Sequence, residues 1–247
     1  MVAGAFVFLL FLPSRIQAPA VIPNEKGSIV VSESGGKPRW TADWTMEPSS
    51  ESGQPAVHFS EHGRGRYTPY TTDVQWSIDA VWLAKDGFYP LRVVKTFTDR
   101  SGKVLSIEKK TFDPKTSTVR IERGDTRTLN APGDTLTIEG IAGVLRFLPF
   151  ESSRAFPVHL LSNEPRIYDI TIEPRGRERV RTPAGEFDCL KVELVAHMGV
   201  LNLFKPFFGK TYFWFSASAP HFWVKYEGYE NGVGTPRIVM ELKSYER

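Results

Sequence analysis

The sequence predicts a mainly β protein, an antiparallel meander that forms a strongly curved or closed, barrel-like sheet with one short covering helix. From Ser28 onward, apolar residues recur with period two, in runs of roughly five to twelve residues that end in turn residues. More than about ten such runs in one chain would leave two long pairing edges if the sheet stayed open, which favours curvature or closure.

The strands expected in the first half follow one another through turn signals. In residues 73–84 the alternation places Trp76, Ile78 and Trp82 on one face, and Lys85-Asp86-Gly87 predicts a hairpin into the next strand. Consecutive hairpins of this kind form a meander. The expected strands are 28–32, 38–47, 55–61, 73–84, 89–98, 103–112 and 117–123.

One helix, over residues 135–148, is expected to interrupt the meander. Asp134 is a suitable N-cap, and Pro149 ends the pattern. The apolar positions of one helical face are Ile138, Ile141, Ala142, Leu145 and Leu148. The helix would cover the core, or act as a lid over the sheet. Strands resume at 156–161, 166–173, 178–182, 186–197, 210–218, 221–228 and 238–245.

The first twenty residues predict export. Residues 2–12 are an unbroken apolar run, and Ala18-Pro19-Ala20 matches the Ala-x-Ala cleavage pattern of signal peptides. About twelve helical residues reach about 18 Å, too short for a hydrocarbon core of about 30 Å. We therefore expect a signal peptide, residues 1–20, cleaved near Ala20, and one periplasmic domain, residues 21–247, with no spanning membrane segment after processing.

Composition excludes several classes of protein and partner. The 31 Lys and Arg against 28 Asp and Glu give a formal net charge of +3, too small to indicate a nucleic-acid partner. Cys189 is the single cysteine, so no internal disulfide can form. A chain of 247 residues can bury a purely apolar core, and no cofactor or structural metal is expected.

Two histidines match a metal-binding pattern that their surroundings do not favour. His58 and His62 fit His-x-x-Glu-His, the inverted zinc-protease motif, which needs a helix to bring both imidazoles to one metal. Pro55 and Gly63 flank the motif and predict a strand that enters a turn. No metal site is therefore predicted.

A basic cluster offers a weak candidate site for anions. Arg175, Arg177 and Arg179 could bind phosphates or anionic glycans, because guanidinium groups bind such oxyanions bidentately. Pro174 and Gly176 predict that the cluster is instead a hairpin turn with solvated charges.

The sequence predicts no catalytic residue. Cys189 alternates with Leu190 in a predicted strand, and no neighbouring motif would activate its thiol, so an inert thiol is expected. Neither a Gly-x-Ser-x-Gly elbow nor a phosphate-binding loop is present.

Several segments, in this order along the chain, carry a resemblance to a known family. They are Tyr89-Pro-Leu-Arg-Val-Val-Lys95, Ser101-Gly-Lys-Val-Leu105, Lys110-Thr-Phe-Asp113, Gly143-Val-Leu-Arg-Phe-Leu-Pro149, Glu178-Arg-Val-Arg-Thr-Pro-Ala-Gly-Glu-Phe-Asp-Cys-Leu-Lys-Val-Glu193, Tyr212-Phe-Trp-Phe-Ser216 and Val224-Lys-Tyr-Glu-Gly228. With them the chain, from about residue 82 to residue 247, resembles the domain of unknown function 3108 family of uncharacterised exported bacterial proteins. The resemblance implies a periplasmic or cell-envelope β-barrel-like domain and brings no established catalytic residue.

The C-terminal strands are apolar on both faces, which an antiparallel sheet with one wet face would not be. Residues 210–218 place Tyr212 and Trp214 on one face and Phe213 and Phe215 on the other. The connection 198–208 before them is more apolar than a surface loop needs to be. Both faces must be covered by the helix and this loop, by a partner, or by an apolar ligand.

The leading functional hypothesis is a periplasmic, non-enzymatic binding protein that holds an apolar or lipid-like ligand, or a lipidated molecule, in a β-barrel groove. The connection 198–208 would be a flap at its mouth. The expected ligand-binding residues are Tyr212, Trp214, Trp223, Phe204, Phe207 and Phe208. One alternative is an envelope assembly or scaffold module that docks a protein or glycan partner. Another is an enzyme acting on cell-envelope polysaccharide.

Overall fold

Fifteen strands join in one sheet in the computed structural model, which describes residues 15–152, 154–197 and 209–247. The strand order is β8-β7-β6-β5-β4-β3-β2-β1-β15-β14-β13-β12-β11-β10-β9. Neighbours pair antiparallel except for β9 and β10, which are parallel. The elements are β1 Glu25–Glu33, β2 Pro38–Glu51, β3 Gln54–Arg66, β4 Asp73–Ala84, β5 Phe88–Thr98, β6 Val104–Asp113, β7 Thr118–Arg123, β8 Asp125–Asn130, β9 Thr135–Thr137, α1 Ile141–Leu145, β10 Phe156–Leu161, β11 Ile167–Thr182, β12 Gly185–His197, β13 Thr211–Ser216, β14 Trp223–Tyr229 and β15 Arg237–Glu246.

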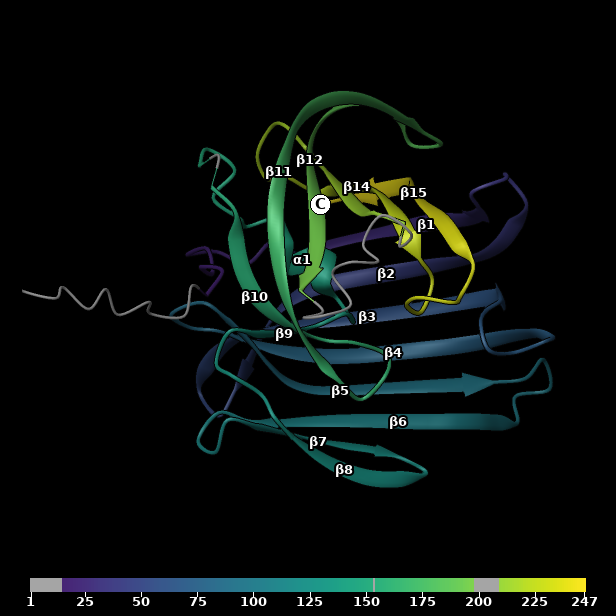
Figure 1. Cartoon of the computed structure of the whole chain (residues 1–247), viewed down its shortest axis with the longest axis vertical. Helices are drawn as coiled ribbons and strands as arrows, with labels where there is room; N and C mark the ends of the chain where they lie inside the picture. The colour runs from purple at the N-terminus through teal and green to yellow at the C-terminus, as the bar shows by residue number, and fades with distance from the viewer. Residues whose placement is uncertain (1–14, 153, 198–208) are drawn as a thin grey trace, which may run out of the picture.

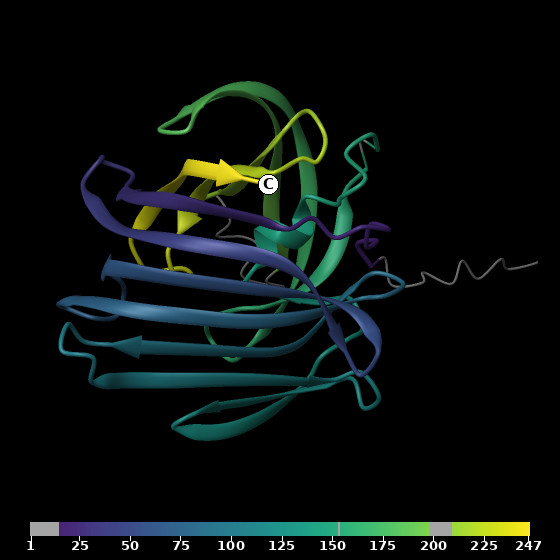
Figure 2. The ribbon, with the colours of Figure 1, turned by 180° about the vertical axis from the view of Figure 1, so that it is seen from behind.

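The sheet is strongly curved and folds over on itself. Figure 1 shows β9 to β12 crossing the face of β2 to β5, and Figure 2 shows the same arrangement from behind. The short strand β9 contacts β5 across the interior, but among the described residues the two end strands, β8 and β9, do not pair with each other. The predicted mainly β meander is therefore confirmed, whereas closure of the sheet is not.

The main core lies between the two layers of this folded sheet, with α1 inside it (Figure 1). Ile141, Val144 and Leu145 are the buried residues of α1. A Cβ at Gly143 would come within 2.8 Å of the Met46 sulfur on β2, so the helix packs directly against that strand. The interior is thus filled by a short helix and by side chains from both layers.

The hairpin predicted at Lys85-Asp86-Gly87 is confirmed. Asp86 and Gly87 take positive φ values, 54° and 110°, between β4 and β5. Positive φ at two successive turn residues matches the right-handed twist of the strands that the turn connects.

The helix predicted over 135–148 is wrong in its first half, and Asp134 is not its N-cap. Residues 135–137 form β9, and α1 begins only after Gly140, whose φ of 73° lies in the left-handed region. No side chain among the described residues caps α1. The Asp134 carboxylate instead lies in hydrogen-bond contact, at 2.7 Å, with the Nδ1 of His159 on β10. Pairing of β9 with β10 overrides the helical spacing of the apolar residues.

The hairpin turn predicted at the basic cluster is also wrong. β11 runs through it without ending, with a β-bulge between Pro174 and Arg177. The bulge leaves Arg175 and Gly176 out of the pairing register, directly after Pro174, which cannot donate to the ladder. The chain turns only after Thr182, before β12 begins at Gly185.

No helix in the described part of the chain is long and apolar enough to cross a bilayer. The apolar run 2–12 and the predicted flap residues Phe204, Phe207 and Phe208 lie outside the described residues.

Candidate functional site

The remaining predicted ligand-binding aromatics lie on two faces of the sheet. Trp214 is buried in a small cluster with Cys189 and Val224, against which Tyr212 packs, separate from the main core. Trp223 belongs to the main core. The predicted two-sided apolarity of these strands is confirmed, but the three aromatics do not surround one cavity, and their ligand-binding role stays a prediction.

Neighbouring side chains cover the small cluster around Trp214. The Lys191 ammonium lies 4.4 Å from the centre of the Tyr212 ring and 4.7 Å from that of Trp214, and the Lys225 ammonium lies 4.9 Å from that of Trp214. The Trp214 indole N–H donates to Glu178. Cation–π contacts and lysine stems of this kind keep an aromatic ring covered without a ligand.

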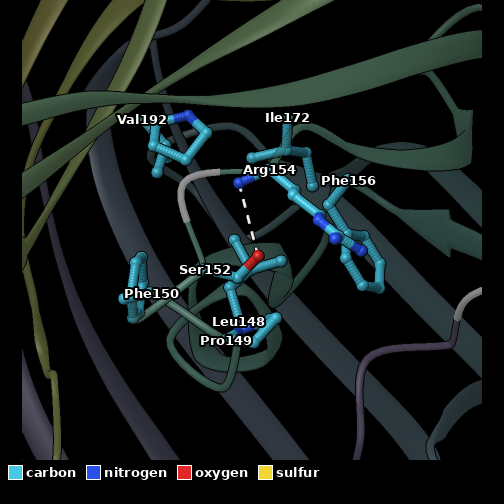
Figure 3. A pocket seen from close by; sticks show the side chains of 9 residues that line it. Leu148, Pro149, Phe150, Ser152, Arg154, Phe156, Ile172 and Val192 are labelled. Atoms are coloured by element: carbon cyan, nitrogen blue, oxygen red, sulfur yellow. Dashed lines mark hydrogen bonds between the residues drawn. The ribbon is translucent and has the colours of Figure 1, made fainter.

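The cavity between the segment that follows α1 and strands β10 to β12 measures about 10 Å³. Figure 3 shows side chains converging on it from both sides. This volume is room for about one water molecule and far too small for an acyl chain. The lining residues are Leu148, Pro149, Phe150, Ser152, Arg154, Phe156, Ile172, Pro174 and Val192.

A larger hollow of about 420 Å³ lies between the tip of the β11–β12 hairpin and the end of β15, and we call it the hairpin groove. β14 pairs with β15 only as far as Glu241, whereas β15 continues beside β1 to Glu246. The hairpin tip closes over this divergence, because the Ala184 N–H donates to the Leu242 carbonyl at 3.1 Å. The groove is lined by Pro183, Ala184, Phe187, Phe222, Lys243, Ser244 and Tyr245.

Three aromatic rings in contact form the apolar part of the groove. Phe222 stacks on Tyr245 with ring centres 4.5 Å apart, and Phe187 meets Phe222 edge-on at 5.5 Å. Such pairs are worth about 0.5–1.5 kcal/mol beyond their buried area, so the rings hold one another in place. The apolar surface of the groove is therefore preformed.

A buried ion pair supports this surface from below. The Tyr245 hydroxyl donates to Glu25 at 2.6 Å, and Glu25 pairs with Arg146, both charged side chains being almost fully buried. Arg146 also donates to the Pro220 carbonyl at 2.9 and 2.7 Å, two residues before Phe222. Burial, together with the hydrogen bond to Glu25, raises the pKa of Tyr245 to about 12, so this phenol stays protonated as a donor.

The rim of the groove carries a cation. Lys243 is exposed, and no carboxylate of the described residues pairs with it. Beside it, the Ser244 hydroxyl lies 2.7 Å from the Ser28 hydroxyl. An apolar floor next to an ammonium group is suited to a molecule with an apolar body and an anionic end.

The basic cluster is on exposed positions of β11, and two of its three arginines have carboxylate partners. Arg175 pairs with Glu193 at 2.7 Å, and Arg179 pairs with Glu186 at 3.0 Å. Arg177 makes no ion pair with a described residue. The anion-binding role of the cluster remains a prediction, with part of its charge neutralised.

The histidine motif lies within a strand, and the cysteine is buried. His58 and His62 are on the strand β3, and the Nε2 of His58 lies 2.6 Å from Asp79. No group of three or more potential metal ligands occurs in the described ranges. Cys189 is fully buried, and burial, with Glu178 and Asp188 nearby, raises the pKa of its thiol to about 12.

Sequence reasoning missed the hairpin groove. Phe187, Phe222 and Tyr245 all fall in predicted strands, but the groove exists only because the tip at Ala184 meets Leu242. That contact joins residues far apart in the sequence, so local periodicity carries no signal for it. The nearest signal is the Phe222-Trp223 pair, which marks a strand apolar on both faces.

Comparisons with known proteins place the chain in a family. The model of DUF3108, described as a protein of unknown function, matches residues 34–243. A crystal structure of a predicted lipoprotein from Parabacteroides distasonis is 12% identical, covers 94% of this chain and 98% of its own, and has a TM-score of 0.35. A protein of Bacteroides fragilis, predicted to be exported and having a YmcC-like fold, is 13% identical, with coverages of 90% and 95% and a TM-score of 0.32. No curated protein matches the chain.

Proposed function

We propose, from the premise that this chain belongs to the DUF3108 family of proteins of unknown function, that it is an exported, non-enzymatic binding protein for an amphipathic, lipid-like molecule. The molecule binds in the hairpin groove, not inside the folded sheet. The observation that carries the proposal is a preformed groove of about 420 Å³ with aromatic walls and a lysine at its rim.

The volumes favour the groove over the cavity that lies beside the segment after α1. Sites for small molecules measure about 300–1,000 Å³, a range that includes the groove and excludes that cavity of about 10 Å³. An apolar chain laid against Phe222 and Phe187 removes about 25 cal/mol of unfavourable hydration per Å² of apolar surface. The walls need little ordering on binding, which lowers the entropic cost.

The polar side chains of the groove favour an anionic end on the ligand. Lys243 is a strongly hydrated point charge on a flexible stem, and it can follow a carboxylate or phosphate at the rim. The Tyr245 hydroxyl is already engaged with Glu25, so its ring, rather than its hydroxyl, faces the ligand's apolar body. Export is supported by the apolar run 2–12 of the sequence.

Binding of 11-(dansylamino)undecanoic acid, a fluorescent fatty acid, tests the proposal. We expect saturable fluorescence enhancement with the wild-type chain, and about tenfold weaker binding to Phe222→Ala. Lys243→Gln should weaken binding of this carboxylate about fivefold and leave binding of the probe's methyl ester unchanged.

Lys85→Gln is the matched control, because Lys85 is also exposed but lies in the β4–β5 turn. This variant should bind both probes as the wild type does. Absence of probe binding by the wild type, or equal binding by Phe222→Ala in a chain with an unchanged thermal midpoint, would contradict the proposal.

A further inference from the structure

Ile16 is a core residue of the folded domain. Its side chain is 2% exposed and packs in the main core. The Phe88 N–H, at the start of β5, donates to the Ile16 carbonyl at 3.0 Å. Ile16 is therefore held both by its side chain and by its backbone.

The domain surface packs closely around Arg15, the residue before Ile16. The Arg15 guanidinium carbon lies 5.7 Å from the centre of the Tyr89 ring. A Cβ at Gly87 would come within 2.8 Å of the Arg15 Cβ, and one at Gly133 within 2.6 Å of its Nη2. Any larger side chain at these two positions would displace Arg15.

Between Arg15 and β1, the chain stays in contact with the rest of the domain. Ala18 and Ile22 are partly buried against the main core, whereas Val21 between them is 78% exposed. This alternation is typical of a segment that lies on the domain surface with one side inward. Residues 15–22 thus follow the domain rather than leaving it.

We infer that the exported protein keeps Arg15–Ala20 as part of its folded domain, so that the Ala18-Pro19-Ala20 pattern is not where the chain is processed. Removal of residues up to Ala20 would delete a fully buried isoleucine and leave an apolar cavity. It would also leave the Phe88 N–H without the partner that it has in the structure. This inference replaces the cleavage expected near Ala20 and is independent of the hairpin groove.

Intact-mass measurement tests the inference directly. The full chain is produced in a Gram-negative host, and the protein recovered from the periplasmic and membrane fractions is weighed. We expect a mass that includes Arg15–Ala20 in every processed form. A mature protein that begins at Val21 would overturn the inference.

Substitutions at two positions in the full chain test the packing that the inference uses. Ile16→Asp should lower the thermal midpoint by about 5–10 °C. If the aspartate variant does not accumulate, the thermal midpoint of Ile16→Ala is measured instead. Val21→Asp is the matched control, because Val21 is exposed, and its midpoint should stay within about 1 °C of the wild type. Equal midpoints for the Ile16 variants and the control would contradict a structural role for this segment.

Discussion

Arg146, which follows the last residue of α1, forms a buried ion pair with Glu25 at the first residue of β1. The pair fixes the helix inside the sheet to the strand that joins its two halves. Arg146 also donates to Pro220, and Glu25 accepts from Tyr245, so one pair of charges positions both α1 and the floor of the hairpin groove.

Loss of both members of this pair should cost less than the two single losses added together. Arg146→Leu should lower the free energy of unfolding by about 3–5 kcal/mol, because it leaves the Glu25 carboxylate buried without its cation. The double variant with Glu25→Gln should lose less than the sum of the two single losses. Urea denaturation of the four proteins gives the coupling energy, and simple additivity would show that the pair does not act as a unit.

Glu139 predicts a loss of stability at acid pH. Burial alone would raise its pKa, but Lys110, 2.7 Å away, and Lys95 outweigh burial and hold the pKa at about 2, below the usual 4.5. A carboxyl with a lowered folded pKa stabilises the fold above its unfolded pKa, so this contribution is lost as pH falls from about 4.5 to 2. At neutral pH it amounts to about 3 kcal/mol.

Glu139→Gln should therefore be less stable than the wild type at pH 7, and the difference should shrink toward pH 2. Unfolding free energies by urea titration at several pH values measure this. Glu47→Gln, at an exposed position, is the control and should leave the pH dependence unchanged. A gap that is the same at pH 7 and pH 2.5 would contradict the assigned pKa.

The thiol of Cys189 should be unreactive in the folded protein. With a pKa of about 12, about one thiol in ten thousand is ionised at pH 8, and the side chain is fully buried. Ellman's reagent should react with it only as fast as the protein unfolds, and within seconds in concentrated urea. A cysteine placed at the exposed turn by Ser101→Cys, in a Cys189→Ala chain, should react quickly in both conditions; fast reaction of native Cys189 would contradict its burial.

Glu230 should be needed to hold together one end of the sheet. Its carboxylate accepts from Arg39 at 2.9 and 2.8 Å, from the Trp40 indole at 2.7 Å and from the Thr68 backbone N–H at 2.9 Å. Glu230→Gln leaves Arg39 without its main counter-charge and should cost about 2–4 kcal/mol in unfolding free energy. Tryptophan fluorescence during urea denaturation measures this, and a loss below about 0.5 kcal/mol would show that these bonds are exchanged freely with water.

Most strands could be predicted because at least one face of each is buried in a hydrophobic cluster, which imposes period two on most of them. The exceptions are strands in which buried and exposed residues do not alternate. β8 is largely exposed at the edge of the sheet, and β9 has only three residues. The predicted helix starts too early because the same apolar spacing is also met by the strand β9, the left-handed Gly140 and the five-residue helix α1 in succession.

The candidate site was less predictable than the fold. The period-two pattern of the sequence correctly places Trp214 on the opposite face of the strand from Phe213 and Phe215. The pattern does not show which face of the sheet encloses a cavity. The apolar interior that the hypothesis required is occupied by α1, and the groove forms at a contact between distant segments. Charge pairing across the fold, such as Arg146 with Glu25, has no local signature either.

The junction of β1 with β15 has a consequence for how the chain reaches its native state. β2 to β8 can form hairpin by hairpin, and so can β10 to β14, but the seam between the two halves needs the final strand, Arg237–Glu246. Non-local pairings of this kind form slowly and leave strand edges exposed meanwhile. Because a chain is synthesised from its N-terminus, maturation therefore waits for the last segment to emerge, and a truncation of these ten residues would leave two unjoined half-sheets prone to aggregation.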